Sequence, residues 1–244
     1  MSNSTPVVKI NPTKVLIVLG GMIVLLVAFS IWGQYLRFNP GAFDINGPID
    51  EFMIDLLMRA FYVDLEANVP TYFNTIILFI PALLMGIIAA WKYSIKDKFK
   101  FQWTGLSLIF LYLSMDEAAV LHERLIKPVR AMLNIYEGWF YFAWIIPGMI
   151  AVALFGLAYI TFFLHLNTKF KLLFFASLAI YIGGIIGGEL VSGHFAQAAG
   201  LDNFNYAMFT SLEESLEYIG CSLLIYSLLT YIKEYLPEGI TISA

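Results

Sequence analysis

The chain contains six stretches of about twenty mostly apolar residues, the length that an α-helix needs to cross the hydrocarbon core of a bilayer. They cover residues 15–35, 71–91, 101–121, 139–164, 172–190 and 206–232. A helix satisfies its backbone hydrogen bonds within one segment, as a lipid-exposed span must. The sequence therefore predicts an all-α, polytopic membrane helical bundle with six transmembrane helices, formed by residues 1–244 as a single membrane domain.

Composition agrees with a bilayer as the solvent. Hydrophobic residues make up 60% of the chain and charged residues only 13%, whereas soluble domains carry about 25% charged residues. The net charge of -4 comes with no basic patch, so we expect no nucleic-acid partner. The single cysteine, Cys221, excludes an intrachain disulfide and a Cys-x-x-Cys motif.

The distribution of Lys and Arg predicts the orientation, because cytoplasmic loops carry an excess of both. With the N-terminus inside, the inner segments hold Lys9, Lys14, Lys92, Lys96, Lys98, Lys100, Lys169, Lys171 and Lys233. The outer segments then hold Arg37, Arg59, Arg124, Lys127 and Arg130. We therefore expect cytoplasmic N- and C-termini, with residues 15–35 kept as an uncleaved anchor.

The loop between the first two stretches is the longest and is expected on the outer face. Within it, residues 48–62 alternate apolar and polar side chains at helical spacing, with Phe52, Leu56 and Arg59 on one face. This pattern predicts an amphipathic helix that lies on the outer membrane surface.

Ionisable residues gather at the predicted outer ends of three stretches. Because placing an ionisable group in the membrane costs free energy, each of them is a candidate for a functional role. The third ends with the run 113–124, the fifth with 187–194, and the sixth begins with 210–218. The third and fifth run outward and the sixth runs inward, so all three polar runs are expected in the same leaflet. The candidate metal ligands or proton-transfer groups are Asp116, Glu117, His122, Glu189, His194, Glu213 and Glu217.

Carboxylates placed this close together in a low dielectric repel one another strongly. Protonation, pairing with Arg124, Lys127 or Arg130, or a bound metal cation would each relieve the repulsion. Carboxylate and imidazole ligands without thiolates suit iron, manganese or zinc. Four-helix di-iron proteins use a similar ligand inventory with Glu-x-x-His spacing, which this chain lacks.

The spacing of the two histidines raises a geometric question. Glu117 and His122 are five residues apart, as are Glu189 and His194, and five residues match one face of an α-helix poorly. A π-bulge would realign such a pair. Alternatively, Gly193 would end its helix and let His194 fold back.

Glycines in the fifth stretch indicate close helix packing. The run 183–188 contains two overlapping pairs of small residues four apart, a spacing that allows another helix to approach closely. We expect this face to pack within the chain.

Two runs, 114–123 (Ser-x-Asp-Glu-x4-His-Glu) and 213–220 (Glu-Glu-x-Leu-Glu), resemble a family of uncharacterised bacterial multi-pass membrane proteins. The resemblance covers the third to sixth stretches. It implies a multi-pass protein of a bacterial inner membrane and carries no known activity.

Three functional hypotheses follow. The first is a metal-dependent oxidoreductase or other enzyme that acts on an apolar substrate, such as a lipid or a quinone, reaching the site from the outer leaflet. The second is a structural or accessory subunit with protein partners in a larger membrane complex. The third is a proton or cation transporter. The inner halves of the stretches contain few polar groups to continue an ion path, which argues against transport. Membrane lipid is an expected partner in each case.

Overall fold

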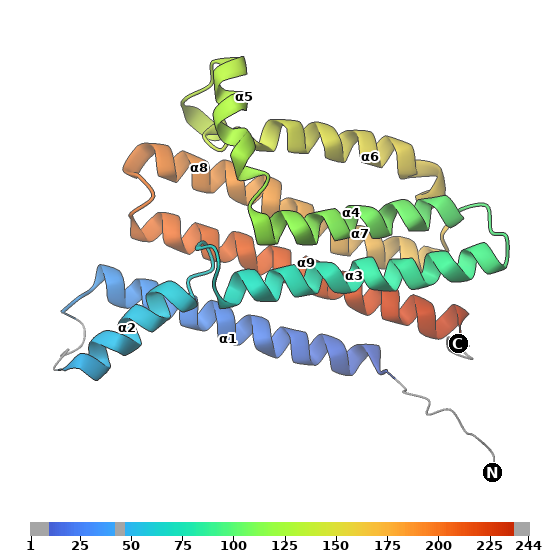
Figure 1. Cartoon of the computed structure of the whole chain (residues 1–244), viewed down its shortest axis with the longest axis horizontal. Helices are drawn as coiled ribbons and strands as arrows, with labels where there is room; N and C mark the ends of the chain where they lie inside the picture. The colour runs from blue at the N-terminus through green and yellow to red at the C-terminus, as the bar shows by residue number, and fades with distance from the viewer. Residues whose placement is uncertain (1–9, 42–46, 237–244) are drawn as a thin grey trace, which may run out of the picture.

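The computed structural model describes residues 10–41 and 47–236, and within these residues the regular structure is helical throughout (Figure 1). Lys9, one of the residues counted for the orientation, lies outside them. The helices of the bundle are α1 (Pro12–Phe38), α3 (Val69–Ser94), α4 (Lys100–Ala119), α6 (Ile145–His165), α7 (Thr168–Ile182), α8 (Gly188–Ala199) and α9 (Phe204–Tyr235). A π-helical turn, η3 (Gly183–Gly187), joins α7 to α8. The shorter elements are α2 (Pro48–Ala60), η1 (Glu123–Leu125), α5 (Ile126–Leu133) and η2 (Gly138–Phe140).

In the described part of the chain, five helical segments are long and apolar enough to cross a membrane: α1, α3, α6, α7 continued through α8, and α9. A sixth span is obtained only if α4 and Glu123–Leu133 are counted together as one broken span, with a bend of 73° between them. Polar residues at both ends of α4, such as Lys100 and Asp116, shorten its apolar stretch. The fold is thus that of a multi-pass helical membrane protein, and the sixth span stays a prediction.

α9 is the central helix. It packs against α1, α3, α7 and α8, and 61% of its most apolar stretch is buried, against 22% for α1 and 11% for α6. The buried thiol of Cys221 donates a hydrogen bond to the carbonyl oxygen of Ile77 at 2.8 Å, which ties α9 to α3. Figure 1 shows α6 at the edge of the bundle.

The glycine run packs within the chain, as predicted. A Cβ at Gly184 would lie 3.0 Å from the Cβ of Leu216, and one at Gly188 would lie 2.6 Å from the Cβ of Glu213, both on α9. Gly183 and Gly187 face open space. α9 contributes a glycine of its own to this contact, Gly220, where a Cβ would lie 2.6 Å from the backbone nitrogen of Tyr181.

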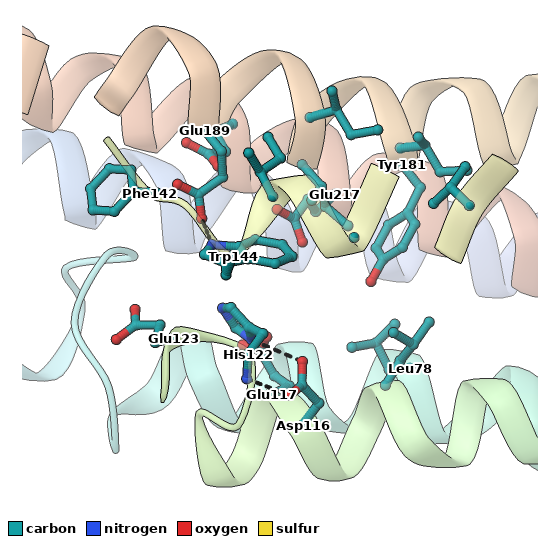
Figure 2. Close-up of a pocket in the computed structure, with 18 of the residues that line it drawn as sticks. Leu78, Asp116, Glu117, His122, Glu123, Phe142, Trp144, Tyr181, Glu189 and Glu217 are labelled. Atoms are coloured by element: carbon teal, nitrogen blue, oxygen red, sulfur yellow. Dashed lines mark hydrogen bonds and ion pairs between the residues drawn. The ribbon is translucent and has the colours of Figure 1, made fainter. Parts of the chain in front are cut away.

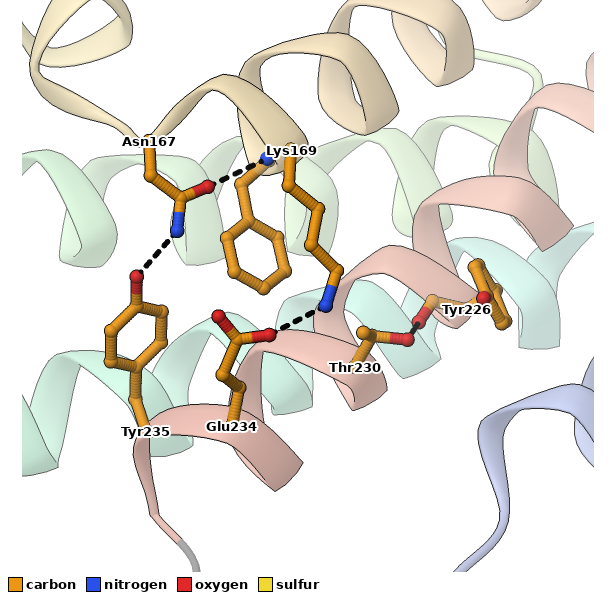
Figure 3. Close-up of polar contacts among 7 residues, drawn as sticks. Asn167, Lys169, Tyr226, Thr230, Glu234 and Tyr235 are labelled. Atoms are coloured by element: carbon orange, nitrogen blue, oxygen red, sulfur yellow. Dashed lines mark hydrogen bonds and ion pairs between the residues drawn. The ribbon is translucent and has the colours of Figure 1, made fainter.

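At the end of the bundle where α7 begins and α9 ends, polar contacts join the two helices (Figure 3). Asn167 accepts a hydrogen bond from the backbone N–H of Phe170 and so caps α7. Its amide nitrogen donates to the hydroxyl of Tyr235 at 2.7 Å, and Lys169 pairs with Glu234 at 2.5 Å. Because Lys169 and Glu234 are both partly exposed, this ion pair adds little stability and mainly fixes orientation.

α2 occupies most of the range in which an amphipathic helix was expected. Leu57 packs directly against Gly33 of α1, where a Cβ would lie 2.9 Å from the carbonyl carbon of Leu57. Ile49, Phe52 and Met53 are exposed. The helix itself agrees with the sequence, whereas its contact with a membrane surface stays a prediction.

Candidate functional site

A cavity of about 620 Å³ lies between α4, α6, α8, α9 and the loop before α3. Nine acidic side chains contribute to its lining: Asp64, Glu66, Asp116, Glu117, Glu123, Glu189, Glu213, Glu214 and Glu217. Within residues 10–41 and 47–236, the one basic side chain that contributes to the lining is His122, and neither Lys nor Arg takes part. Figure 2 shows several of these side chains converging from opposite walls.

Asp116 and His122 form a carboxylate–imidazole pair on one wall. Asp116 accepts two hydrogen bonds from His122, one from the backbone N–H and one involving Nδ1, each at 2.8 Å (Figure 2). Because Nδ1 is occupied, Nε2 is the ring nitrogen left for a ligand or substrate. Metal-binding histidines are commonly oriented by a carboxylate in this way.

A left-handed residue makes the Asp116–His122 pair possible. α4 ends at Ala119, and Val120 follows with φ 52° and ψ 46°. Its N–H bonds back to the carbonyl oxygen of Asp116, which turns the chain and returns His122 to the helix end. The left-handed region is strained for a β-branched residue, and such strain is most often found at functional sites.

The opposite wall is joined to this pair through Trp144. The indole of Trp144 lies 4.5 Å from the ring of His122, measured between centroids. Its Nε1 donates a hydrogen bond to Glu189 at 2.9 Å. A continuous set of contacts therefore runs from α4 to α8 across the start of α6.

Three carboxylates of α9 complete the cavity, and small residues make room for them. Glu213 packs against Gly188, and Glu217 lies against Gly184. Glu213 and Glu217 are almost fully buried, at 7% and 9% exposure. One carboxylate oxygen of Glu214 is buried without a hydrogen-bond partner among the described residues.

The structure brings six of the seven candidate residues to the cavity: Asp116, Glu117, His122, Glu189, Glu213 and Glu217. His194 is not among them, because it is exposed and stacks on Trp139 with ring centroids 5.0 Å apart. Residues 188–199 form a regular helix, and five residues place His194 about 140° around it from Glu189. The π-helical turn lies before this pair rather than within it.

The helix bounds place one acidic residue, Glu189, farther inside than the sequence indicated, whereas the start of α9 agrees with the predicted sixth stretch. α8 continues beyond Glu189 to Ala199, and α9 begins at Phe204, well before Glu213. The polar run 187–194 was interpreted as a helix end, but its glycines and serine are accommodated within a continuing helix. Glu189 therefore lies inside the continuous helical segment Thr168–Ala199, and Glu213 lies inside α9.

The sequence also left open a pairing of these carboxylates with three basic residues of the outer loop. No ion pair of Arg124, Lys127 or Arg130 with the cavity carboxylates is present in residues 10–41 and 47–236. Arg130 instead donates to the carbonyl oxygen of Tyr141 and lies over the ring of the same residue. The cavity therefore receives no compensating charge from this loop.

The candidate donor atoms of the described residues are not grouped around one point, as the ligands of a bound metal ion would be. Among the described residues, no group of three or more His, Cys, Asp or Glu side chains is close enough to hold a metal ion. The candidate ligands share one cavity without sharing one coordination point.

Sequence reasoning missed Asp64 and Glu66, which reach the cavity from the loop between α2 and α3. Tyr206 of α9 donates a hydrogen bond to Asp64 at 3.1 Å. Burial raises the pKa of Asp64 to about 7, despite this hydrogen bond. Nothing in the sequence distinguishes these two carboxylates from ordinary loop residues. Glu214 was detectable, because helical spacing places it within about 100° of both Glu213 and Glu217.

A multi-pass helical membrane protein with an acidic cavity inside the bundle is the class that these features define. The chain belongs to the family described as Domain of unknown function (DUF8692), which it matches over residues 15–232. The match includes every residue that lines the cavity. No curated protein and no solved structure matches the chain.

Proposed function

We propose that this protein is a membrane-embedded, metal-dependent enzyme that acts on an apolar substrate. The observation that carries the proposal is the composition of the cavity lining, where nine acidic side chains meet and no Lys or Arg of the described residues takes part. At low dielectric their mutual repulsion is too large to leave uncompensated. A divalent cation relieves it and gives the cluster a chemical role.

The composition of the cluster indicates the kind of metal. Oxygen donors with one imidazole and no thiolate suit iron, manganese or zinc. His122 supports the assignment, because Asp116 holds its Nδ1 and leaves Nε2 for the metal. Glu189 and Glu213 would supply oxygen from the facing wall.

Metal binding requires movement of the side chains. Because the donor groups do not converge on one point in the described residues, the carboxylates must rotate inward as a cation enters. Glutamate side chains can do so with little change of the backbone, since they have several rotatable bonds. The bound metal would act as a Lewis acid or lower the pKa of a coordinated water.

The location proposed for the protein is a bacterial inner membrane, with both termini in the cytoplasm and the cavity nearer the outer leaflet. The excess of Lys at the α3–α4 loop supports this orientation. α2 would lie on the outer surface, with Ile49, Phe52 and Met53 towards lipid.

Transport is the less favoured function. A second cavity of about 300 Å³ adjoins the first and is lined by residues such as Met85, Trp103 and Phe174, with no carboxylate or histidine. An ion path across the bundle would need polar groups there.

Elemental analysis of the purified protein tests the metal proposal. The wild type is reconstituted with iron(II), manganese(II) or zinc(II), desalted and compared with Glu189→Gln and with Glu137→Gln, which changes an exposed glutamate outside the cavity. We expect the wild type and Glu137→Gln to retain one of these metals. Glu189→Gln should retain about tenfold less at the same free metal concentration, because a charged ligand is lost while side-chain volume is kept.

Two results would overturn the metal proposal. One is a wild type that retains none of the three metals after desalting. The other is equal retention by Glu189→Gln and Glu137→Gln, since the metal would then lie elsewhere. Circular dichroism of all three proteins verifies that the helices are intact.

A further inference from the structure

The acidic cavity continues into an apolar one. The second cavity, of about 300 Å³, shares Leu106, Phe110, Phe155 and Leu178 with the first. Its other lining residues include Trp103, Phe162 and Phe174. In Figure 2 the carboxylates lie at one end of the first cavity, and Leu78 and Tyr181 lie towards the other. A molecule that fills both spaces must be polar at one end and apolar along its length.

One wall of this combined space, α6, is loosely packed. Residues of α6 line both cavities, among them Val152 and Phe155 in the first and Gly156 and Ile160 in the second. Only 11% of its most apolar stretch is buried, and Ile150, Leu154 and Leu157 are exposed. In a bilayer these surfaces would meet lipid, so a hydrocarbon chain can enter beside α6 without passing through water.

The polar end of the space favours a cation. Aromatic rings of Trp144 and Tyr206 line the first cavity together with the carboxylates, and both residues contact a carboxylate directly, Trp144 through Glu189 and Tyr206 through Asp64. Aromatic faces with nearby acidic groups are the arrangement that binds ammonium groups. An anionic head group would instead be repelled by the carboxylates.

We propose that the two cavities together bind an amphiphile with one hydrocarbon chain and an amine head group, which enters from the membrane beside α6. The amine lies among the carboxylates of α4, α8 and α9, and the chain extends between α4, α6 and α7. That this amphiphile is a substrate rests on the proposed function. That the cavities bind it can be tested separately. One divalent cation offsets only two of nine potential negative charges, so carboxylates remain that can pair with an amine.

Photocrosslinking with a long-chain amine tests this proposal. The probe is hexadecylamine with a diazirine near the end of its chain, presented to the full-length protein in phosphatidylcholine nanodiscs. Its amine is protonated at neutral pH. We expect crosslinks in α4, α6 and α7, which unlabelled hexadecylamine suppresses and hexadecanoic acid does not.

A matched pair of glycine substitutions tests the position of the chain. A Cβ at Gly156 meets nothing within 4 Å, and Gly156 lines the apolar cavity, so Gly156→Trp adds a large side chain at the wall of that cavity. Gly21→Trp adds the same side chain on α1, also in open space and far from both cavities. We expect Gly156→Trp to weaken the amine by about tenfold, a loss of about 1.4 kcal/mol, and Gly21→Trp to leave it unchanged.

The outcomes separate the two proposals. Crosslinks confined to residues that line neither cavity, equal competition by the acid, or equal effects of the two tryptophans would overturn the amphiphile site. Elemental analysis of the same samples reports the metal independently. Specific amine binding by protein that retains no metal would leave this inference standing and end the metal proposal, and the reverse pattern would do the opposite.

Discussion

Asp64 is the residue whose ionisation most directly links the cavity to stability. It lies in the loop before α3, outside the spans, where burial raises its pKa from 3.8 to about 7. Between these pH values the unfolded chain has released the proton and the folded chain still holds it. The stability that Asp64 contributes is therefore complete below pH 3.8 and is lost as the pH rises through about 7.

Asp64→Asn should remove this dependence, because the amide resembles the protonated acid and never ionises. Above pH 7 we expect the variant to be more stable than the wild type by about 2 kcal/mol, allowing for partial exposure of the side chain. Near pH 4 the two should melt together. Thermal unfolding in detergent at several pH values measures this, with the exposed Glu51→Gln as control. A difference that is constant with pH would contradict it.

Single residues also show how far the sequence could predict the site. Asp116, Glu117, Glu189, Glu213 and Glu217 were identifiable because they interrupt apolar stretches. The Asp116–His122 pair was not, since it depends on the left-handed conformation of Val120, which a β-branched residue rarely adopts. His194 was expected at the site but lies outside the cavity, because the helix continues through Gly193 and turns the imidazole away.

Among the elements, α7 and α9 approach each other backbone to backbone at Gly220, where added volume is poorly tolerated. A Cβ at Gly220 would lie 2.6 Å from the backbone nitrogen of Tyr181, and backbone cannot move aside as a side chain can. We expect Gly220→Ala to lower the free energy of unfolding by about 1–3 kcal/mol. Gly20→Ala on α1 meets nothing within 4 Å and should be neutral or slightly stabilising. Equal melting temperatures for the two variants would show that α7 and α9 are farther apart.

The elements themselves were largely predictable, since apolar length specifies a membrane helix. Helix ends inside polar runs were not. α8 extends to Ala199 and α6 begins only at Ile145, after a 3-10 turn. The π-helical turn at Gly183–Gly187 had no signal beyond its glycines, because its formation depends on how α9 packs against it.

For the whole molecule, the first turn of α1 and the last turn of α9 lie at the same end of the bundle (Figure 1). If α4 completes a sixth crossing, this arrangement places both termini on one side of the membrane. The prediction distinguishes six crossings from five, which would place them on opposite sides.

Cysteine labelling tests this topology. In a Cys221→Ser background, Glu51→Cys of α2 should react with a membrane-impermeant maleimide in intact cells. Lys98→Cys, in the exposed loop before α4, should react only after permeabilisation. A third cysteine placed at Lys233, near the end of α9, should behave like Lys98→Cys. Labelling at position 233 in intact cells would exclude six crossings.

The hydrogen bond from Cys221 to Ile77 gives the chain a built-in reporter of unfolding. Since this thiol is the only one in the chain and is buried, a thiol-reactive fluorophore cannot reach it while α3 and α9 remain together. The onset of fluorescence during heating then marks the separation of these two helices. Ligands can thus be screened against unmodified protein, and any compound that occupies the bundle should delay the signal.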